Sequence, residues 1–145
     1  MTTTRPLPTL RFLPHPLAAA LHLALLAAAF ALFMGRKPGV FRSDTLAGLL
    51  PGVYTHISNF SISYLLLAGV GYLWLMAGAT FRLVAWAGVA LATVNVVYET
   101  WIPVLNTRDP VDAAYGVVGT ALAAAVLGLV ARYGLRPAPA ARTAE

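Results

Sequence analysis

Residues 60–79, FSISYLLLAGVGYLWLMAGA, contain no charged side chain. An apolar run of about 20 residues is the length that an α-helix needs to cross the hydrocarbon core of a membrane. Helices and closed barrels are the structures that satisfy their backbone hydrogen bonds inside lipid. The stretch therefore predicts a membrane-spanning helix, and it sets the class of the whole chain.

Three further apolar runs of similar length lie at residues 17–34, 83–101 and 113–131. The chain has 145 residues, of which 59% are hydrophobic and 10% are charged, whereas about 25% are charged in a soluble domain. We predict an all-α integral membrane protein in which these four transmembrane helices form one bundle.

The rest of the chain divides around this membrane domain, which we place at residues 17–133. Residues 1–16 and 134–145 are rich in proline, threonine or alanine and predict a flexible N-terminal tail and a disordered C-terminal tail. Residues 42–59 hold a short segment that Ser43 or Asp44 could cap. It is too short to span, so we expect an interfacial or re-entrant segment. The first apolar run resembles a signal peptide, but its length favours a retained helix.

The net charge of +5 is spread around the apolar runs, which fits a membrane better than nucleic acid. With a cytoplasmic N-terminus, the basic residues on that side would be Arg5, Arg11, Arg82, Arg132, Arg136 and Arg142, and those outside would be Arg36, Lys37, Arg42 and Arg108. The positive-inside rule therefore favours cytoplasmic N- and C-termini.

Polar residues gather at the predicted outer ends of the helices. Two series of small residues at helical spacing end in an acid, one at Glu99 and the other at Asp112. Such stripes let membrane helices approach closely, so both acids should face the bundle. The predicted pocket residues are Asn95, Glu99, Arg108, Asp109 and Asp112, with His56 and Asn59 at the rim. His22 should form hydrogen bonds within the bundle.

Each of these residues also has a structural interpretation. Asp109 precedes a proline and fits an N-cap, Arg108 could form an ion pair with Glu99, and His56 could anchor the chain at the interface. The chain has no cysteine, and no phosphate loop, zinc-type histidine pair or serine nucleophile elbow occurs. A metal ion held by His56, Glu99, Asp109 and Asp112 is conceivable as an oxygen-rich site, but the spacing of these residues does not specify one. We therefore assign no catalytic residue, metal or cofactor.

The stretch YETWIPVLNTRDPVDAAYGVVGTAL, residues 98–122, resembles the VanZ-like family of small bacterial membrane proteins, which is named after a teicoplanin-resistance protein. The residues that carry the resemblance are Glu99, Pro103, Arg108, Asp109, Asp112 and Gly119. A fainter similarity at THISNFSISY extends it to about residues 55–128. The resemblance implies a place in the bacterial inner membrane. It also implies a role in the cell envelope that acts on glycopeptide or lipid-linked molecules.

Three functions follow from these observations as hypotheses. The first is an outer-face pocket that binds an amphiphilic cell-envelope molecule, with a role in envelope homeostasis or glycopeptide resistance. The second is a membrane-embedded enzyme that uses Glu99 or Asp112 as a general base on a lipid-linked phosphate or glycan. The third is a structural partner that docks other helices, or forms an oligomer, through its small-residue stripes.

Overall fold

The computed structural model describes residues 10–102 and 109–139. Along the chain the elements are β1 (Phe12–Pro14), α1 (Pro16–Met34), α2 (Asp44–Leu49), α3 (Val53–Ala77), α4 (Phe81–Trp101), α5 (Pro110–Leu129), the π-helix η1 (Val130–Gly134) and β2 (Leu135–Pro137).

Within the part of the chain that the structure describes, four helical segments are long and apolar enough to cross a membrane: Pro16–Met34, Val53–Ala77, Phe81–Trp101 and Pro110–Gly134. They have 19 to 25 residues, and at about 1.5 Å per residue each matches a hydrocarbon core of about 30 Å. Large apolar side chains on their outer surface, such as Trp86 and Leu129, are 62% exposed. The fold is therefore that of a multi-pass, all-α membrane protein, as the sequence predicts.

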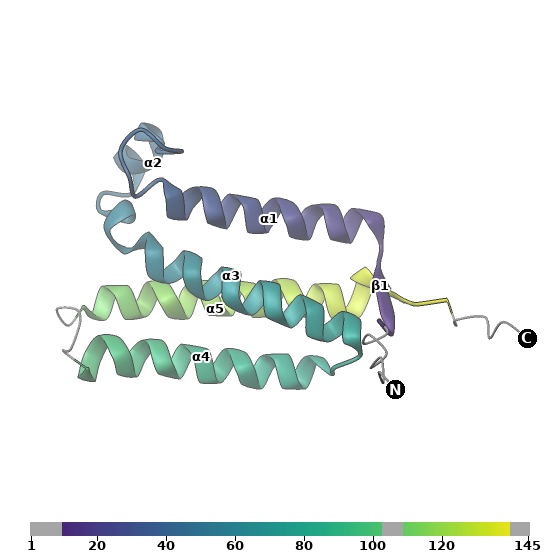
Figure 1. Cartoon of the computed structure of the whole chain (residues 1–145). Coiled ribbons are helices and arrows are strands. Elements are labelled where there is room, and N and C mark those ends of the chain that lie inside the picture. Colours follow the sequence, from purple (N-terminus) through teal and green to yellow (C-terminus); the bar gives the residue numbers. More distant parts are fainter. Residues whose placement is uncertain (1–9, 103–108, 140–145) are drawn as a thin grey trace, which may run out of the picture.

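The helices lie side by side, with α3 packed against α1, α4 and α5 (Figure 1). The most extensive contact is between α3 and α5. Gly119 permits it, because a Cβ atom at this position would collide with the backbone carbonyl of Phe60. The core is formed by buried side chains from all four helices, and the largest fully buried ones are Tyr64, Leu127 and Val84. This packing fixes α3 against α5.

One end of the bundle carries α2 together with the end of α4 and the starts of α3 and α5 (Figure 1). We call it the α2 end. Ser43 caps α2, since its side chain accepts a hydrogen bond from the Leu46 backbone N–H at 3.3 Å. Gly52, at φ 82°, then turns the chain into α3. α3 begins at Val53, before the predicted residue 60, because the polar side chains of His56 and Asn59 have partners on neighbouring helices.

The opposite end of the bundle holds a small antiparallel sheet (Figure 1). Phe12 is opposite Pro137 and Pro14 is opposite Leu135. We expected only irregular tails at residues 1–16 and 134–145, and for the described parts this expectation is wrong. The segments that enter α1 and leave η1 lie next to each other, so their backbones pair although each is rich in proline. Proline is tolerated here because a two-stranded sheet has only edge strands.

Candidate functional site

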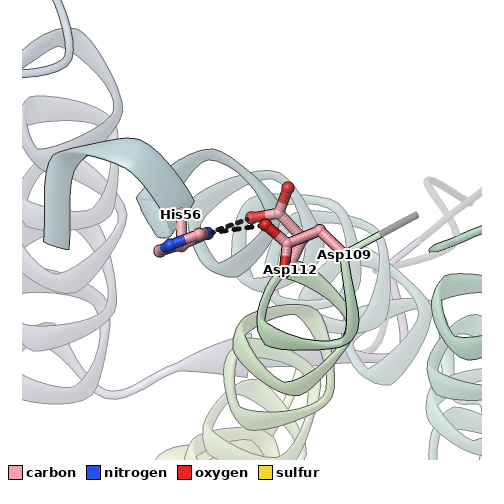
Figure 2. Close-up of side chains that lie close together, drawn as sticks. All are labelled: His56, Asp109 and Asp112. Atoms are coloured by element: carbon pink, nitrogen blue, oxygen red, sulfur yellow. Dashed lines mark hydrogen bonds and ion pairs between the residues drawn. The ribbon is translucent and has the colours of Figure 1, made fainter. Parts of the chain in front are cut away.

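Three side chains from two helices meet at the α2 end of the bundle. The Nδ1 atom of His56, on α3, lies 2.8 Å from Asp112 Oδ1 and 3.5 Å from Asp109 Oδ2, both at the start of α5. Figure 2 shows the imidazole edge directed at the two carboxylates. The side chains of His56, Asp109 and Asp112 are 20%, 32% and 15% exposed. They form a partly buried set, which we call the His–Asp cluster.

The local sequence of α5 sets the position of both carboxylates. Asp109 is the N-cap, and its Oδ1 atom accepts a hydrogen bond from the Val111 backbone N–H at 2.8 Å. Pro110 occupies the first turn, where a missing N–H costs nothing. Asp112 lies in the same turn, where the positive end of the helix dipole stabilises its charge. The cap uses one oxygen of Asp109, so its other oxygen is the one near His56.

The position of His56 is set by α3 and by an aromatic neighbour. His56 lies in the first turn of α3, on the side that faces α5. The ring of Tyr115 lies 5.6 Å from the imidazole, measured between centroids. Since Tyr115 follows Asp112 by three residues on α5, one face of that helix supplies both the acid and the aromatic contact.

A second set of polar contacts joins α3 to α4 next to the cluster. Asn59 donates from Nδ2 to Glu99 Oε1 at 3.0 Å, and Glu99 is only 5% exposed. One turn further along α3, Ser63 Oγ accepts a hydrogen bond from Asn95 Nδ2 at 2.9 Å. Gly116 on α5 leaves room for the Asn95 side chain, since a Cβ atom there would lie 2.8 Å from it. These contacts hold the helix interfaces together.

An apolar groove of about 390 Å³ lies beside the His–Asp cluster, and we call it the α2 groove. Tyr115 lines it and also contacts His56, and Ile57 lines it next to His56 in sequence. Val118, a further lining residue, is 56% exposed. Among the described residues, the lining is Leu32, Leu46, Leu50, Val53, Ile57, Phe60, Ala114, Tyr115 and Val118. Tyr115 therefore borders both the His–Asp cluster and the α2 groove.

The seven predicted site residues fall into three groups. His56, Asp109 and Asp112 meet in the cluster, and Asn59 with Glu99 and Asn95 lies between α3 and α4. The third group is Arg108, which lies outside the described residues. His56 was expected at the rim, but it contacts both aspartates. Asn59, Asn95 and Glu99 do not line the α2 groove.

Sequence reasoning missed Ser63, which accepts the hydrogen bond from Asn95. The signal was present in the spacing of His56, Asn59 and Ser63, which are three and four residues apart and so share one face of a helix. It went unnoticed because the second helix was expected to begin only at residue 60.

His22 is a second buried histidine, 2% exposed, on α1. Neither ring nitrogen has a hydrogen-bond partner within residues 10–102 and 109–139, so the expected hydrogen bonds are not formed there. The imidazole instead stacks on Tyr72, with the ring centroids 4.0 Å apart. His22 therefore contributes to packing between α1 and α3.

The fold and the site together define a multi-pass helical membrane protein with a His–Asp cluster at one end of its bundle. Comparisons with models of protein families, with curated proteins and with solved structures find no match.

Proposed function

We propose that the protein is a VanZ-like protein of the bacterial inner membrane that binds an amphiphilic cell-envelope molecule at its α2 end. In this proposal both termini are cytoplasmic, the α2 end faces outward, and α2 lies at the membrane interface. The bound molecule places its head group on the His–Asp cluster and a hydrocarbon chain in the α2 groove.

The observation that carries this proposal is the contact of the cluster with the groove through Tyr115. An amphiphile needs a polar site and an apolar site next to each other, and the two are linked here by one side chain. The groove volume of about 390 Å³ falls within the range of about 300–1,000 Å³ that is typical of small-molecule sites. It is open toward the region that lipid would occupy, since Val118 and Leu50 are more than half exposed.

The chemistry of the cluster favours a head group that donates hydrogen bonds. Ionised carboxylates only accept hydrogen bonds, and a charged donor strengthens such bonds roughly twofold. Asp109 and Asp112 would therefore select amines or hydroxyls. Arg108, next to Asp109 in the sequence, would add a contact to a phosphate or another anionic group.

Native mass spectrometry of the purified protein with a bacterial envelope lipid extract tests this function. We expect retained lipid on the native protein, less of it after Asp112→Asn, and least after Val118→Trp, which fills the groove. Val94→Trp is the matched control, because Val94 is also an exposed valine, 62% against 56%, but does not line the groove. Equal retention by the two tryptophan variants would contradict the proposal.

The enzyme hypothesis names Glu99 or Asp112 as the base, and of these only Asp112 lies in the His–Asp cluster. Glu99 is almost fully buried and accepts a hydrogen bond from Asn59 between helices, outside the α2 groove. The small-residue stripes of α4 and α5, which the structural-partner hypothesis would use, contribute to packing inside the bundle at Gly88 and Gly116. Binding of an amphiphile is therefore the function that the site supports best.

A further inference from the structure

We infer that the His–Asp cluster is a binding site for a divalent transition-metal ion, with Zn²⁺ as the preferred ion. The site combines one imidazole from α3 with two carboxylates from α5, so its ligands come from two different helices. The spacing along the chain does not reveal it, because residue 56 is far in sequence from residues 109 and 112.

The distances between the ligand atoms suit one shared ion. His56 Nδ1, one oxygen of Asp109 and one oxygen of Asp112 all lie within 4.8 Å of one another. Zn²⁺ binds nitrogen and carboxylate oxygen at about 2.0–2.2 Å, which places tetrahedral ligands about 3.4 Å apart. The two distances from Nδ1, 2.8 and 3.5 Å, lie on either side of that value. Completing the geometry requires side-chain shifts of about 0.6 Å or more, since the 2.8 Å distance must lengthen to about 3.4 Å.

The balance of charge at the cluster also favours a cation. Both carboxylates face the same imidazole nitrogen, Nδ1 of His56 (Figure 2). That nitrogen can carry only one hydrogen, so it can donate a good hydrogen bond to only one of them. A proton on Nδ1 satisfies Asp112 at 2.8 Å but leaves Asp109 at 3.5 Å, beyond a good hydrogen bond. A divalent ion in place of that proton neutralises both carboxylates at once.

The ligand types select the class of ion. Imidazole suits zinc and related transition metals, whereas Mg²⁺ and Ca²⁺ prefer sites made of oxygen alone. Three protein ligands are also the number found in zinc sites that keep one position open for a water or another molecule. A hydroxyl oxygen of the amphiphile's head group would take that position. This role rests on the proposed function, whereas metal binding itself does not.

The test measures Zn²⁺ binding to the full-length protein, purified in detergent with a non-histidine tag and stripped with a chelator. A titration against a chromophoric zinc chelator should give one Zn²⁺ per chain. Asp112→Asn and Asp109→Asn should each weaken binding by at least about tenfold, the scale of losses around metal sites. Asparagine keeps the N-cap at position 109, so Asp109→Asn should stay folded, as circular dichroism would verify.

Two variants serve as matched controls. Asp44→Asn removes an exposed acid at the same end, and His15→Gln removes an exposed histidine from the other end. Both should bind Zn²⁺ like the native protein. Absence of stoichiometric Zn²⁺, or equal losses in the controls, would overturn the metal site.

Lipid retention measured with and without a chelator separates this inference from the proposed function. Loss of bound lipid when the chelator removes Zn²⁺ would support both the metal site and the proposed function. Retained lipid on a protein that binds no Zn²⁺ overturns the metal site alone. Stoichiometric Zn²⁺ without any lipid supports the metal site and overturns the proposed function.

Discussion

Replacing Gly119 by alanine should separate the two helices that form the His–Asp cluster. A Cβ atom at position 119 would lie 2.9 Å from the carbonyl carbon of Phe60 and closer still to its oxygen. The obstacle is backbone, so no side-chain rotation can relieve it. α5 and α3 would have to move apart by about 1 Å to restore ordinary carbon contacts.

The size of the effect can be bounded with a second glycine. Overpacking of this kind costs about 1–3 kcal/mol, while alanine in place of glycine within a helix gains about 0.5–1 kcal/mol. Gly69, on α3, has no atom of the described residues within 4 Å of an added Cβ atom, so Gly69→Ala should show the gain alone. The free energies of unfolding of the two variants should therefore differ by about 1–3 kcal/mol.

Unfolding in mixed micelles, with increasing amounts of a denaturing detergent and far-UV circular dichroism as the signal, gives this difference. We expect Gly69→Ala to unfold at a higher detergent fraction than the native protein and well above Gly119→Ala. Zn²⁺ binding should also weaken in Gly119→Ala, because the ligands come from the two separated helices. If the two alanine variants unfold at the same detergent fraction, the result would contradict the close contact between α3 and α5.

Three other changes test the remaining contacts. His22→Phe should raise the free energy of unfolding by about 1–3 kcal/mol, because it removes two buried nitrogens that have no partner among the described residues and keeps a ring against Tyr72; a less stable variant would contradict this expectation. Asn59→Leu should lower the free energy of unfolding by about 1.5–3 kcal/mol in the same assay, because the charged group of Glu99 loses a hydrogen-bond donor. An unchanged free energy would mean that this hydrogen bond contributes nothing. A single Asp44→Cys variant should react with a membrane-impermeant thiol reagent in intact cells, whereas reaction only after lysis would reverse the proposed orientation.

The four spanning helices were predictable because the signal is long and local. The twenty uncharged residues at positions 60–79 have the length that an α-helix needs to span lipid. The starts of helices were harder to predict. Val53 begins α3 because His56 and Asn59 bind distant residues, and hydropathy alone assigns such polar residues to a loop. The strand pair β1–β2 was not predicted for the same reason: each strand forms only by pairing with the other, which is distant in the sequence.

Only part of the site was predictable: His56, Asp109 and Asp112 were named as pocket residues, whereas their pairing and the lining of the α2 groove, including Tyr115, were not. Helical spacing turned Glu99 and Asp112 toward the bundle, and Asp109-Pro110 indicated the N-cap that the structure contains. Nothing local shows that His56 contacts the aspartates while Glu99 contacts Asn59. That pairing depends on the rotation of α3 against α4 and α5, which close packing at positions such as Gly119 determines.

Chemical cross-linking between positions 56 and 112 tests the central claim most directly, because the chain has no native cysteine. In a His56→Cys, Asp112→Cys protein, a short thiol-specific cross-linker should join the two peptides, as mass spectrometry after proteolysis would detect. A His56→Cys, Arg82→Cys protein is the control, since Arg82 lies at the start of α4, at the opposite end of the bundle. Efficient joining of the first pair and none of the second is the predicted result, and failure of the first pair to join would contradict the His–Asp cluster.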